Sequence, residues 1–340
     1  MQVRTAVASS MLALASYGTA AQAETFTVNF ASPALDRWNY PFNPTPGTRI
    51  TASTFGNEPG GMMFDNRDGQ FIVGFDTAGV VPTGLGASNY SVSSCVVELT
   101  YANDGIVEYD PTVDPYTAFL PTTDPEYVDD ADLGQPIELY GVGFRNGFSL
   151  ANWTEFTTFG TGNVLNPSVR NAFALGTNAA GQPVDVSNSV RERWTPQPFA
   201  VGQIAKLKPG ALVPIGTKLR FHLDVANPAV QSYLRDAVHA GKLRLTACSL
   251  TKVVQQGGNF PTFYCRENPI VTATGSGAAT LSMIVSTQTC VPADLNCDGA
   301  VSAQDVALLL SQWGTAGNAD LNGDGTVGSP DLAILLGAWT

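Results

Sequence analysis

DLNCDGAVSAQDVALLLSQW, residues 294–313, and DLNGDGTVGSPDLAILLGAW, residues 320–339, are two copies of one 20-residue pattern in a chain of 340 residues. Each copy begins with Asp, Asn and Asp at alternate positions, followed by Gly, and has a further Asp at its twelfth residue. Apolar residues at helical spacing follow that Asp in both copies. A pattern repeated in this way predicts two copies of one structural unit, each a loop followed by a helix.

Oxygen-bearing side chains occupy positions 1, 3, 5 and 12 of each 12-residue loop, and Gly299 and Gly325 occupy position 6. Such loops bind Ca²⁺ through side chains 1, 3 and 5, the carbonyl oxygen of residue 7 and a carboxylate at residue 12, while glycine at position 6 permits a sharp turn. We therefore predict two structural calcium ions. The predicted ligands are Asp294, Asn296, Asp298, the Ala300 carbonyl and Asp305 in the first loop, and Asp320, Asn322, Asp324, the Thr326 carbonyl and Asp331 in the second.

Each predicted helix carries one apolar stripe that it cannot bury alone. The stripes consist of Val306, Leu309, Leu310 and Trp313 in the first copy and Leu332, Leu335, Leu336 and Trp339 in the second. We therefore expect the two helices to pack against each other as a pseudo-twofold pair.

The paired loop-helix pattern resembles a type I dockerin, in a divergent form that ends in Leu-Leu-x-x-Trp. The resemblance covers residues 289–340 and includes the ligand spacing, the glycine at position 6, and Val301 and Val327 at position 8. Position 12 is Asp rather than the Glu of an EF-hand, and no helical pattern precedes either loop. The resemblance implies calcium-dependent docking on a cohesin-like domain in an extracellular polysaccharide-handling or cell-surface assembly.

The positions at which the best-known dockerins contact cohesin differ in this sequence. Those dockerins carry hydroxyl or small aliphatic residues at loop positions 10 and 11 and basic residues at 17 and 18, whereas no Lys or Arg follows Arg266. The corresponding residues are Ala303, Gln304, Leu310 and Ser311 in one copy and Ser329, Pro330, Leu336 and Gly337 in the other. The receptor can therefore be a divergent cohesin, a wall component or a partner not yet defined.

Residues 1–23 have the pattern of a secretory signal peptide. Arg4 gives the positive start, residues 6–15 form an apolar core, and Ala21 and Ala23 provide a small-residue cleavage site. No other stretch approaches the ~20 consecutive apolar residues that a membrane span requires. We expect a secreted protein, extracellular or at the cell surface, with no membrane span.

Five cysteines in a secreted chain permit two disulfides and leave one thiol. Cys290 lies four residues before the first loop and Cys297 lies within it, so we expect these two to form a bridge. Cys248 and Cys265 flank a turn at symmetric offsets, and two alternatives remain: they pair with each other, or Cys95 pairs with one of them.

The formal net charge is −12, and the acidic residues are concentrated in one stretch. No Lys or Arg lies between Arg67 and Arg145, whereas ten Asp and Glu residues run from Asp104 to Glu138. We expect a solvated acidic segment, and the negative field of the chain argues against nucleic acid or anionic lipid as a partner. A third cation site within residues 110–132 is an alternative, although four prolines interrupt the stretch and no ligand spacing repeats.

Residues 24–288 have the sequence pattern of an all-β domain, because short runs of Val, Ile, Thr and aromatic residues alternate with clusters of Gly, Pro, Asn and Asp. The predicted strands are residues 25–30, 71–75, 94–101, 137–144, 219–225, 242–251, 263–266 and 279–286. One helix is predicted to begin with Asn227 as N-cap and Pro228 as first residue and to end before Gly241. The predicted fold class is mainly β, a jelly-roll-like antiparallel β-sandwich followed by a small α-helical module of two calcium loop-helix repeats.

Three segments of the body resemble DNRLRE-type secreted jelly-roll domains: FIVGFDTAG at residues 71–79, SSCVVELTYAND at 93–104 and FYCREN at 263–268. The acidic insertion and residues 146–209 do not match that family.

The sequence does not identify catalytic residues, and the missing nucleophile signature favours a non-catalytic body. A polysaccharide-degrading hydrolase or lyase is one alternative, with Glu98, Glu138 and Glu155 as candidates for the two facing carboxylates that glycosidases require. His222 and His239 are expected at the surface or at a helix end. A second alternative is a carbohydrate-binding or adhesive body, and a third is a purely structural surface protein. The aromatic residues that either pack in the core or stack on sugar rings are Trp38, Tyr40, Phe42, Trp153 and Trp194.

Overall fold

The computed structural model describes residues 22–340 except 57–64, 164–165, 167–168, 179 and 254–258. Almost all of the predicted signal peptide lies outside the described residues. The described chain forms two compact units, one of residues 25–287, here called the body, and one of residues 22–24 together with 288–340. Residues 288–340 are here called the C-terminal module.

The body contains two main sheets and one short two-stranded sheet. The four-stranded sheet has the order β1 (Gln22–Phe30), β13 (Thr280–Thr289), β5 (Tyr90–Thr100) and β10 (Lys218–His222). The seven-stranded sheet has the order β2 (Leu35–Asn39), β4 (Gln70–Asp76), β11 (Lys242–Cys248), β6 (Glu138–Phe144), β7 (Ala172–Thr177) and β8 (Pro183–Asp185), with β9 (Ala200–Val201) beside β6. The third sheet pairs β12 (Thr262–Tyr264) with β3 (Thr51–Ser53). The pairs β5–β10, β4–β11, β6–β11, β5–β13, β2–β4 and β6–β7 are antiparallel.

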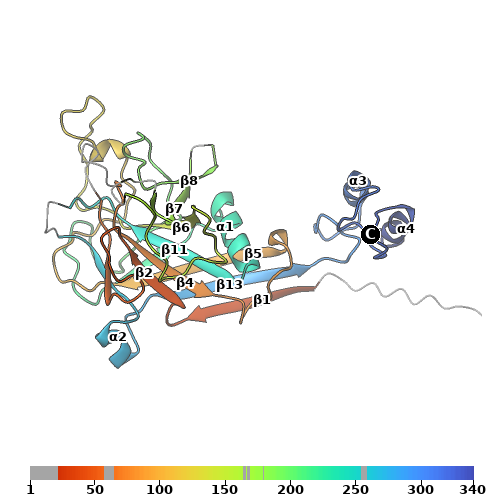
Figure 1. Cartoon of the computed structure of the whole chain (residues 1–340), viewed down its shortest axis with the longest axis horizontal. Helices are drawn as coiled ribbons and strands as arrows, with labels where there is room; N and C mark the ends of the chain where they lie inside the picture. The colour runs from red at the N-terminus through yellow and green to blue at the C-terminus, as the bar shows by residue number, and fades with distance from the viewer. Residues whose placement is uncertain (1–21, 57–64, 164–165, 167–168, 179, 254–258) are drawn as a thin grey trace, which may run out of the picture. The chain divides into compact units, whose positions relative to one another are not determined.

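The strand order is that of a jelly roll. When β1, β4, β5, β6, β7, β10, β11 and β13 are numbered one to eight, the sheets read 1-8-3-6 and 2-7-4-5, which is the order produced by two interleaved Greek keys. Strands from the two ends of the body, β1 and β13, therefore lie side by side (Figure 1). The prediction of a mainly β, jelly-roll-like antiparallel sandwich is confirmed.

The main core lies between the two sheets. Phe71, Val73 and Phe75 of β4 join the same buried cluster as Val97 and Leu99 of β5. Strand β10 shows the strict alternation of exposed and buried residues that is expected when only one face of a sheet is covered.

The outer face of the seven-stranded sheet is buried as well, which the alternating pattern of the sequence does not predict. Strands β4 and β6 are buried along nearly their whole length. Ile72 and Val142 pack with Trp153, and Tyr140 packs with Val186, so the segments that contain Trp153 and Val186 cover this face.

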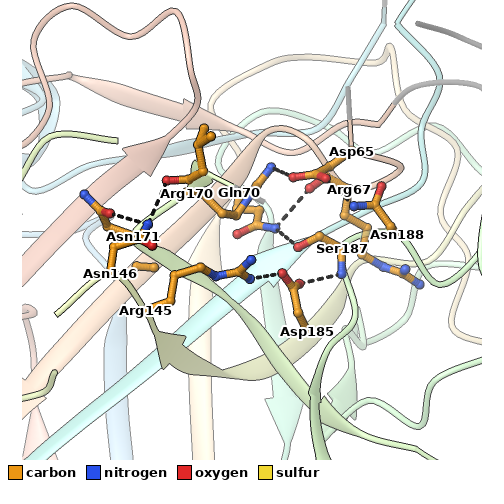
Figure 2. A network of polar contacts seen from close by, with 12 residues as sticks. Asp65, Arg67, Gln70, Arg145, Asn146, Arg170, Asn171, Asp185, Ser187 and Asn188 are labelled. Atoms are coloured by element: carbon orange, nitrogen blue, oxygen red, sulfur yellow. Dashed lines mark hydrogen bonds and ion pairs between the residues drawn. The ribbon is translucent and has the colours of Figure 1, made fainter. Parts of the chain in front are cut away.

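Buried ion pairs hold the covering segments to the sheet. Arg67 donates hydrogen bonds of 2.5 and 3.0 Å to the two carboxylate oxygens of Glu138, and both side chains are almost fully buried. Arg170 forms an ion pair with Asp65, which accepts a further hydrogen bond from Asn188 (Figure 2). Because an unpaired buried charge costs several kcal/mol, each of these pairs fixes its two segments together.

Helix α1 (Pro228–His239) follows its predicted end signals. The Asn227 side chain accepts a hydrogen bond from the Ala229 N–H, and Val230, Leu234 and Val238 are buried. The helix contacts both β5 and β11, so it lies against strands of both sheets, as expected for a cap on the sandwich. The other helices of the described chain are the short η1 (Ala87–Asn89), η2 (Tyr116–Phe119) and α2 (Pro269–Thr274) in the body, and α3 (Ala303–Ser311) and α4 (Ser329–Gly337) in the C-terminal module.

The prediction of a second disulfide in the body is wrong. Cys95, Cys248 and Cys265 are all buried free thiols. Strand β11, which carries Cys248, pairs with β4 and β6, while β12, which precedes Cys265, pairs with β3, so the two cysteines do not face each other across one hairpin. Burial raises the pKa of Cys95 to about 12, and these thiols therefore behave as apolar core residues.

Candidate metal centre

The two acidic loops of the C-terminal module have the same backbone conformation. Gly299 and Gly325, both at position 6, have the same φ of 92°. The residues at position 4, Cys297 and Gly323, also have positive φ values, of 60° and 74°. Side chains other than glycine avoid the conformation at position 6, so the repeated glycine is required by the turn.

The first Asp of each loop organises the turn through the backbone. Asp294 accepts hydrogen bonds from the N–H groups of Asp298 at 3.2 Å and Gly299 at 2.9 Å. In the second loop, Asp320 accepts the corresponding bonds from Asp324 at 3.2 Å and Gly325 at 2.8 Å. Equal contacts in both copies show that the repeated sequence encodes a repeated geometry.

The Asp at position 12 closes each loop from the first turn of the following helix. Asp305 accepts hydrogen bonds from the N–H groups of Asn296 at 3.1 Å and Ser302 at 2.8 Å. Asp331 accepts the equivalent bonds from Asn322 at 3.1 Å and Gly328 at 2.7 Å. Each carboxylate thereby joins position 3 to position 9 of its own loop.

Both closing carboxylates are held in the ionised form, although both residues are buried. Burial raises the pKa of Asp305, but hydrogen bonds from the backbone of Ser302, Asn296 and Leu295 lower it, and the net pKa lies below its ordinary value. The same balance, with donors from Gly328, Asn322 and Leu321, lowers the pKa of Asp331. An ionised carboxylate with lone pairs left over is suited to bind a cation.

The polar side chains at positions 3 and 5 lie together on the open side of each loop. The Asn296 amide donates a hydrogen bond of 2.8 Å to Asp298, and the Asn322 amide donates one of the same length to Asp324. The side-chain ligands predicted for positions 1, 3, 5 and 12 are therefore linked by hydrogen bonds within each loop. An all-oxygen set of this kind suits a hard cation such as Ca²⁺ and not a soft metal.

One small core joins the two repeats. It contains corresponding residues of both copies, namely Ala293, Val301 and Leu309 from the first and Ala319, Val327 and Leu335 from the second. Helices α3 and α4 contact each other (Figure 1), in agreement with the predicted pseudo-twofold pair.

Reciprocal hydrogen bonds also connect the repeats. The Gly314 N–H, just after α3, donates to the Val327 carbonyl of the second loop at 2.9 Å. The Thr340 N–H, just after α4, donates to the Val301 carbonyl of the first loop at 3.2 Å. The end of each helix is thus fastened to the loop of the other repeat.

Half of each predicted apolar stripe remains exposed on the C-terminal module. Leu309 and Leu335 are fully buried, but Leu310 and Leu336 are each 52% exposed, and Trp313 and Trp339 are 46% and 49% exposed. The helix pair therefore covers only one side of each stripe. The exposed apolar set of the module, which we call the duplicated apolar surface, comprises Leu308, Leu310, Trp313, Ile334, Leu336 and Trp339.

The predicted bridge between Cys290 and Cys297 is present, with seven residues of sequence separation. It connects the segment before the first loop to position 4 of that loop. The second loop has Gly323 at this position, so the disulfide is specific to the first repeat.

The three candidate glutamates of the body lie in ion pairs rather than facing one another across a groove. Glu98 pairs with Lys218 and Arg220, Glu138 with Arg67, and Glu155 with Arg266.

Among the candidate aromatic residues, Trp153 is buried against Arg37, and Trp38 stacks on Tyr40 with a ring separation of 4.7 Å. Trp194 is half-buried and donates a hydrogen bond to Glu192. His222 is exposed, and His239, at the end of α1, accepts a hydrogen bond from the Gly86 N–H.

Comparison with known proteins identifies the C-terminal segment. Residues 292–337 match the family model of the dockerin type I domain. No significant match of the chain to a curated protein or to a solved structure was found. The DNRLRE-type resemblance of the body therefore stays a prediction. No helix in the described part of the chain is both long and apolar enough to cross a membrane.

Replacing Gly325 by alanine should weaken the C-terminal module. No atom lies within 4 Å of the added Cβ, so the cost is the backbone strain of an L-residue at positive φ, about 1–2 kcal/mol. Gly337→Ala is the matched control, because Gly337 also has open space around its Cα but is the last residue of α4 and does not have a positive φ, so alanine causes no backbone strain there. Amide hydrogen exchange of residues 320–340 in the full chain measures both effects, and equal protection in the two variants would contradict this account of the loop.

Proposed function

We propose that the protein is a secreted jelly-roll protein whose body is attached to a cohesin-like receptor through the C-terminal module in a calcium-dependent manner. The duplicated loop geometry, with the same hydrogen bonds around Asp294 and Asp320, is the observation that carries this proposal. The family match to the dockerin type I domain supports a cohesin-like domain as the kind of partner. The pattern of residues 1–23 supports export to an extracellular or cell-surface location.

Two calcium ions hold the C-terminal module together in this proposal. The ligands are those at positions 1, 3, 5, 7 and 12 of each loop, and bound calcium supplies the positive charge that the module lacks, since no Lys or Arg follows Arg266. The core of the module consists of only six fully buried apolar residues. A core of this size contributes little stability, so the free energy of ion binding becomes free energy of folding.

The duplicated apolar surface is the proposed docking site for the cohesin-like domain. Leu310 and Trp313 of the first repeat correspond to Leu336 and Trp339 of the second, and all four are about half exposed. Loop positions 17, which are basic in the best-known dockerins, hold Leu310 and Leu336 in this chain. Recognition through apolar contact in place of charge would select a divergent cohesin.

A carbohydrate-binding role of the body is a second candidate, favoured by one surface hollow. A cavity of about 670 Å³ beside β7 is lined by Trp194 together with hydroxyl and amide side chains, namely Thr177, Asn178, Thr195 and Gln197. An aromatic ring surrounded by hydroxyl and amide groups can stack on a sugar and bind its hydroxyl groups. The ion pairing of Glu98, Glu138 and Glu155 gives no corresponding support to a glycoside hydrolase.

The docking proposal predicts that Leu310→Asp combined with Leu336→Asp abolishes binding to the cohesin-like receptor. Each leucine contributes about 1.5–3 kcal/mol when it is buried, and an introduced carboxylate would be desolvated at the interface. Both repeats are changed because they present the same surface. Biolayer interferometry of the full chain against cohesin domains of the producing organism measures the loss, with EDTA as a second condition that removes calcium.

Val128→Asp is the control for this experiment, because Val128 is an apolar residue of the body with 58% exposure. It should leave binding unchanged. Calcium-independent binding, or full binding by the double variant, would show that the receptor uses another surface.

The carbohydrate proposal predicts that Trp194→Ala weakens glycan binding by the body about two- to tenfold, because an aromatic stacking contact contributes about 0.5–1.5 kcal/mol. A glycan array followed by calorimetry on the bound glycans measures the effect. Phe42→Ala, at an exposed aromatic residue outside this cavity, should have no effect. An array without any bound glycan would remove this candidate.

A further inference from the structure

The long connection between β5 and β6 buries part of its acidic charge. This segment was expected to be solvated, but Asp110 and Asp114 are only 3% and 6% exposed. Glu138, at the end of the connection, is also buried and is neutralised by Arg67. No ion pair within the described residues involves Asp110 or Asp114, so their burial needs another explanation.

Three carboxylates converge in this connection. One carboxylate oxygen each of Asp110, Asp114 and Asp132 lies within 4.8 Å of the other two. Thr112 holds part of the cluster in place, because its N–H and hydroxyl lie 2.8 and 2.6 Å from one oxygen of Asp110 and its hydroxyl lies 2.9 Å from Asp132. Two further oxygens, Oδ2 of Asp110 and Oδ2 of Asp114, are buried and have no hydrogen-bond partner in the protein.

The backbone fixes this arrangement. Tyr109 exchanges hydrogen bonds with residues 210 and 211, at 2.8 and 2.9 Å, which holds the chain next to Asp110. Gly134 has a φ of 98° and packs so closely that a Cβ at this position would lie 2.9 Å from the Glu108 carbonyl oxygen and 3.1 Å from the Cβ of Asp110. Only glycine permits so close an approach, so the carboxylates are brought together by the fold and not by chance side-chain rotation.

The cluster is electrostatically unfavourable as it stands. Burial, followed by the charges of Asp110, Asp130 and Asp132, raises the pKa of Asp114 to about 8. Burial also raises the pKa of Asp110 above its ordinary value, against hydrogen bonds from Thr112 that lower it. A buried group of carboxylates is stabilised either by protons or by a bound cation.

A second acidic group in the body shows the contrast. Asp36, Glu155 and Glu267 also lie within 4.8 Å of one another. Arg266 lies among them, with ion pairs to Glu155 and Glu267 and a backbone N–H bonded to Asp36. That group therefore contains its own cation, whereas the cluster at Asp110 does not.

We propose that Asp110, Asp114 and Asp132 form a binding site for a hard divalent cation, separate from the two loops of the C-terminal module. The donors are all carboxylate oxygens, which is the ligand type of Ca²⁺ and Mg²⁺. Two of the ligands are buried and one is exposed, so water completes the coordination from the Asp132 side. A bound ion would fasten both ends of the connection, residues 110–114 and residue 132, to each other beside the start of β6.

The test counts ions on the full chain after the C-terminal loops are disabled by Asp294→Ala, Asp298→Ala, Asp320→Ala and Asp324→Ala. Equilibrium dialysis against CaCl₂ or MgCl₂ in 0.1 M KCl, with the metal measured by mass spectrometry, should give one bound ion per chain for at least one of the two metals. No bound ion at millimolar concentration of either metal would overturn the proposal and would show that protons stabilise the cluster.

Adding Asp114→Asn to the loop-disabled chain should lower the affinity at least about tenfold, because affinity at such sites follows the number of charged ligands. Asp129→Asn, at an exposed residue of the same connection, is the matched control and should leave binding unchanged. Asp132→Asn changes an exposed ligand, and this variant replaces Asp114→Asn if the change at the buried residue disturbs folding. The ion should also raise the melting temperature of the body in the control and not in the ligand variants. Equal ion binding by all three variants would overturn the assignment of these residues.

Discussion

Carboxylate charge without a neutralising side chain is the constraint on which the C-terminal module depends. Six Asp residues lie in two loops, and no Lys or Arg occurs after Arg266. Backbone N–H groups shape the loops and keep Asp305 and Asp331 ionised, but they do not remove the repulsion among like charges. The small shared core and the reciprocal bonds at Val301 and Val327 link the repeats, so an ion bound in one loop would also stabilise the other repeat.

The body also contains buried carboxylates, and they occur in two different environments. Where acids are buried at the seven-stranded sheet, arginines neutralise them. Arg67 pairs with Glu138, and Arg170 pairs with Asp65, as Figure 2 shows for the second pair. In the connection between β5 and β6 the sequence provides no arginine, and one buried carboxylate oxygen each of Asp110 and Asp114 has no hydrogen-bond partner. A bound cation in that connection would have the role that arginine has elsewhere in the body.

The sequence predicts those features that depend on local spacing. The loop conformation follows from oxygen ligands and glycine at fixed positions, and α1 follows from Asn227, Pro228 and Gly241. Burial of the outer face of the seven-stranded sheet could not be predicted, because the residues that cover it, such as Trp153 and Val186, lie outside the strands in segments without regular alternation. The prediction of a second disulfide in the body is wrong for a related reason. The neighbours of β11 are set by the jelly-roll topology and not by distance along the chain. From the sequence, a cation site at this carboxylate cluster is only an alternative, because the three residues are spaced irregularly and meet through tertiary contacts at Gly134 and Tyr109.

The central claim is that the C-terminal module folds around calcium while the body folds by its own core. Hydrogen exchange of the full chain, measured segment by segment with millimolar calcium and with excess chelator, tests this claim most directly. The account predicts that residues 294–340 lose their protection in chelator, whereas β4, β11 and β6 keep theirs. Equal protection of α3 and α4 under both conditions would contradict it.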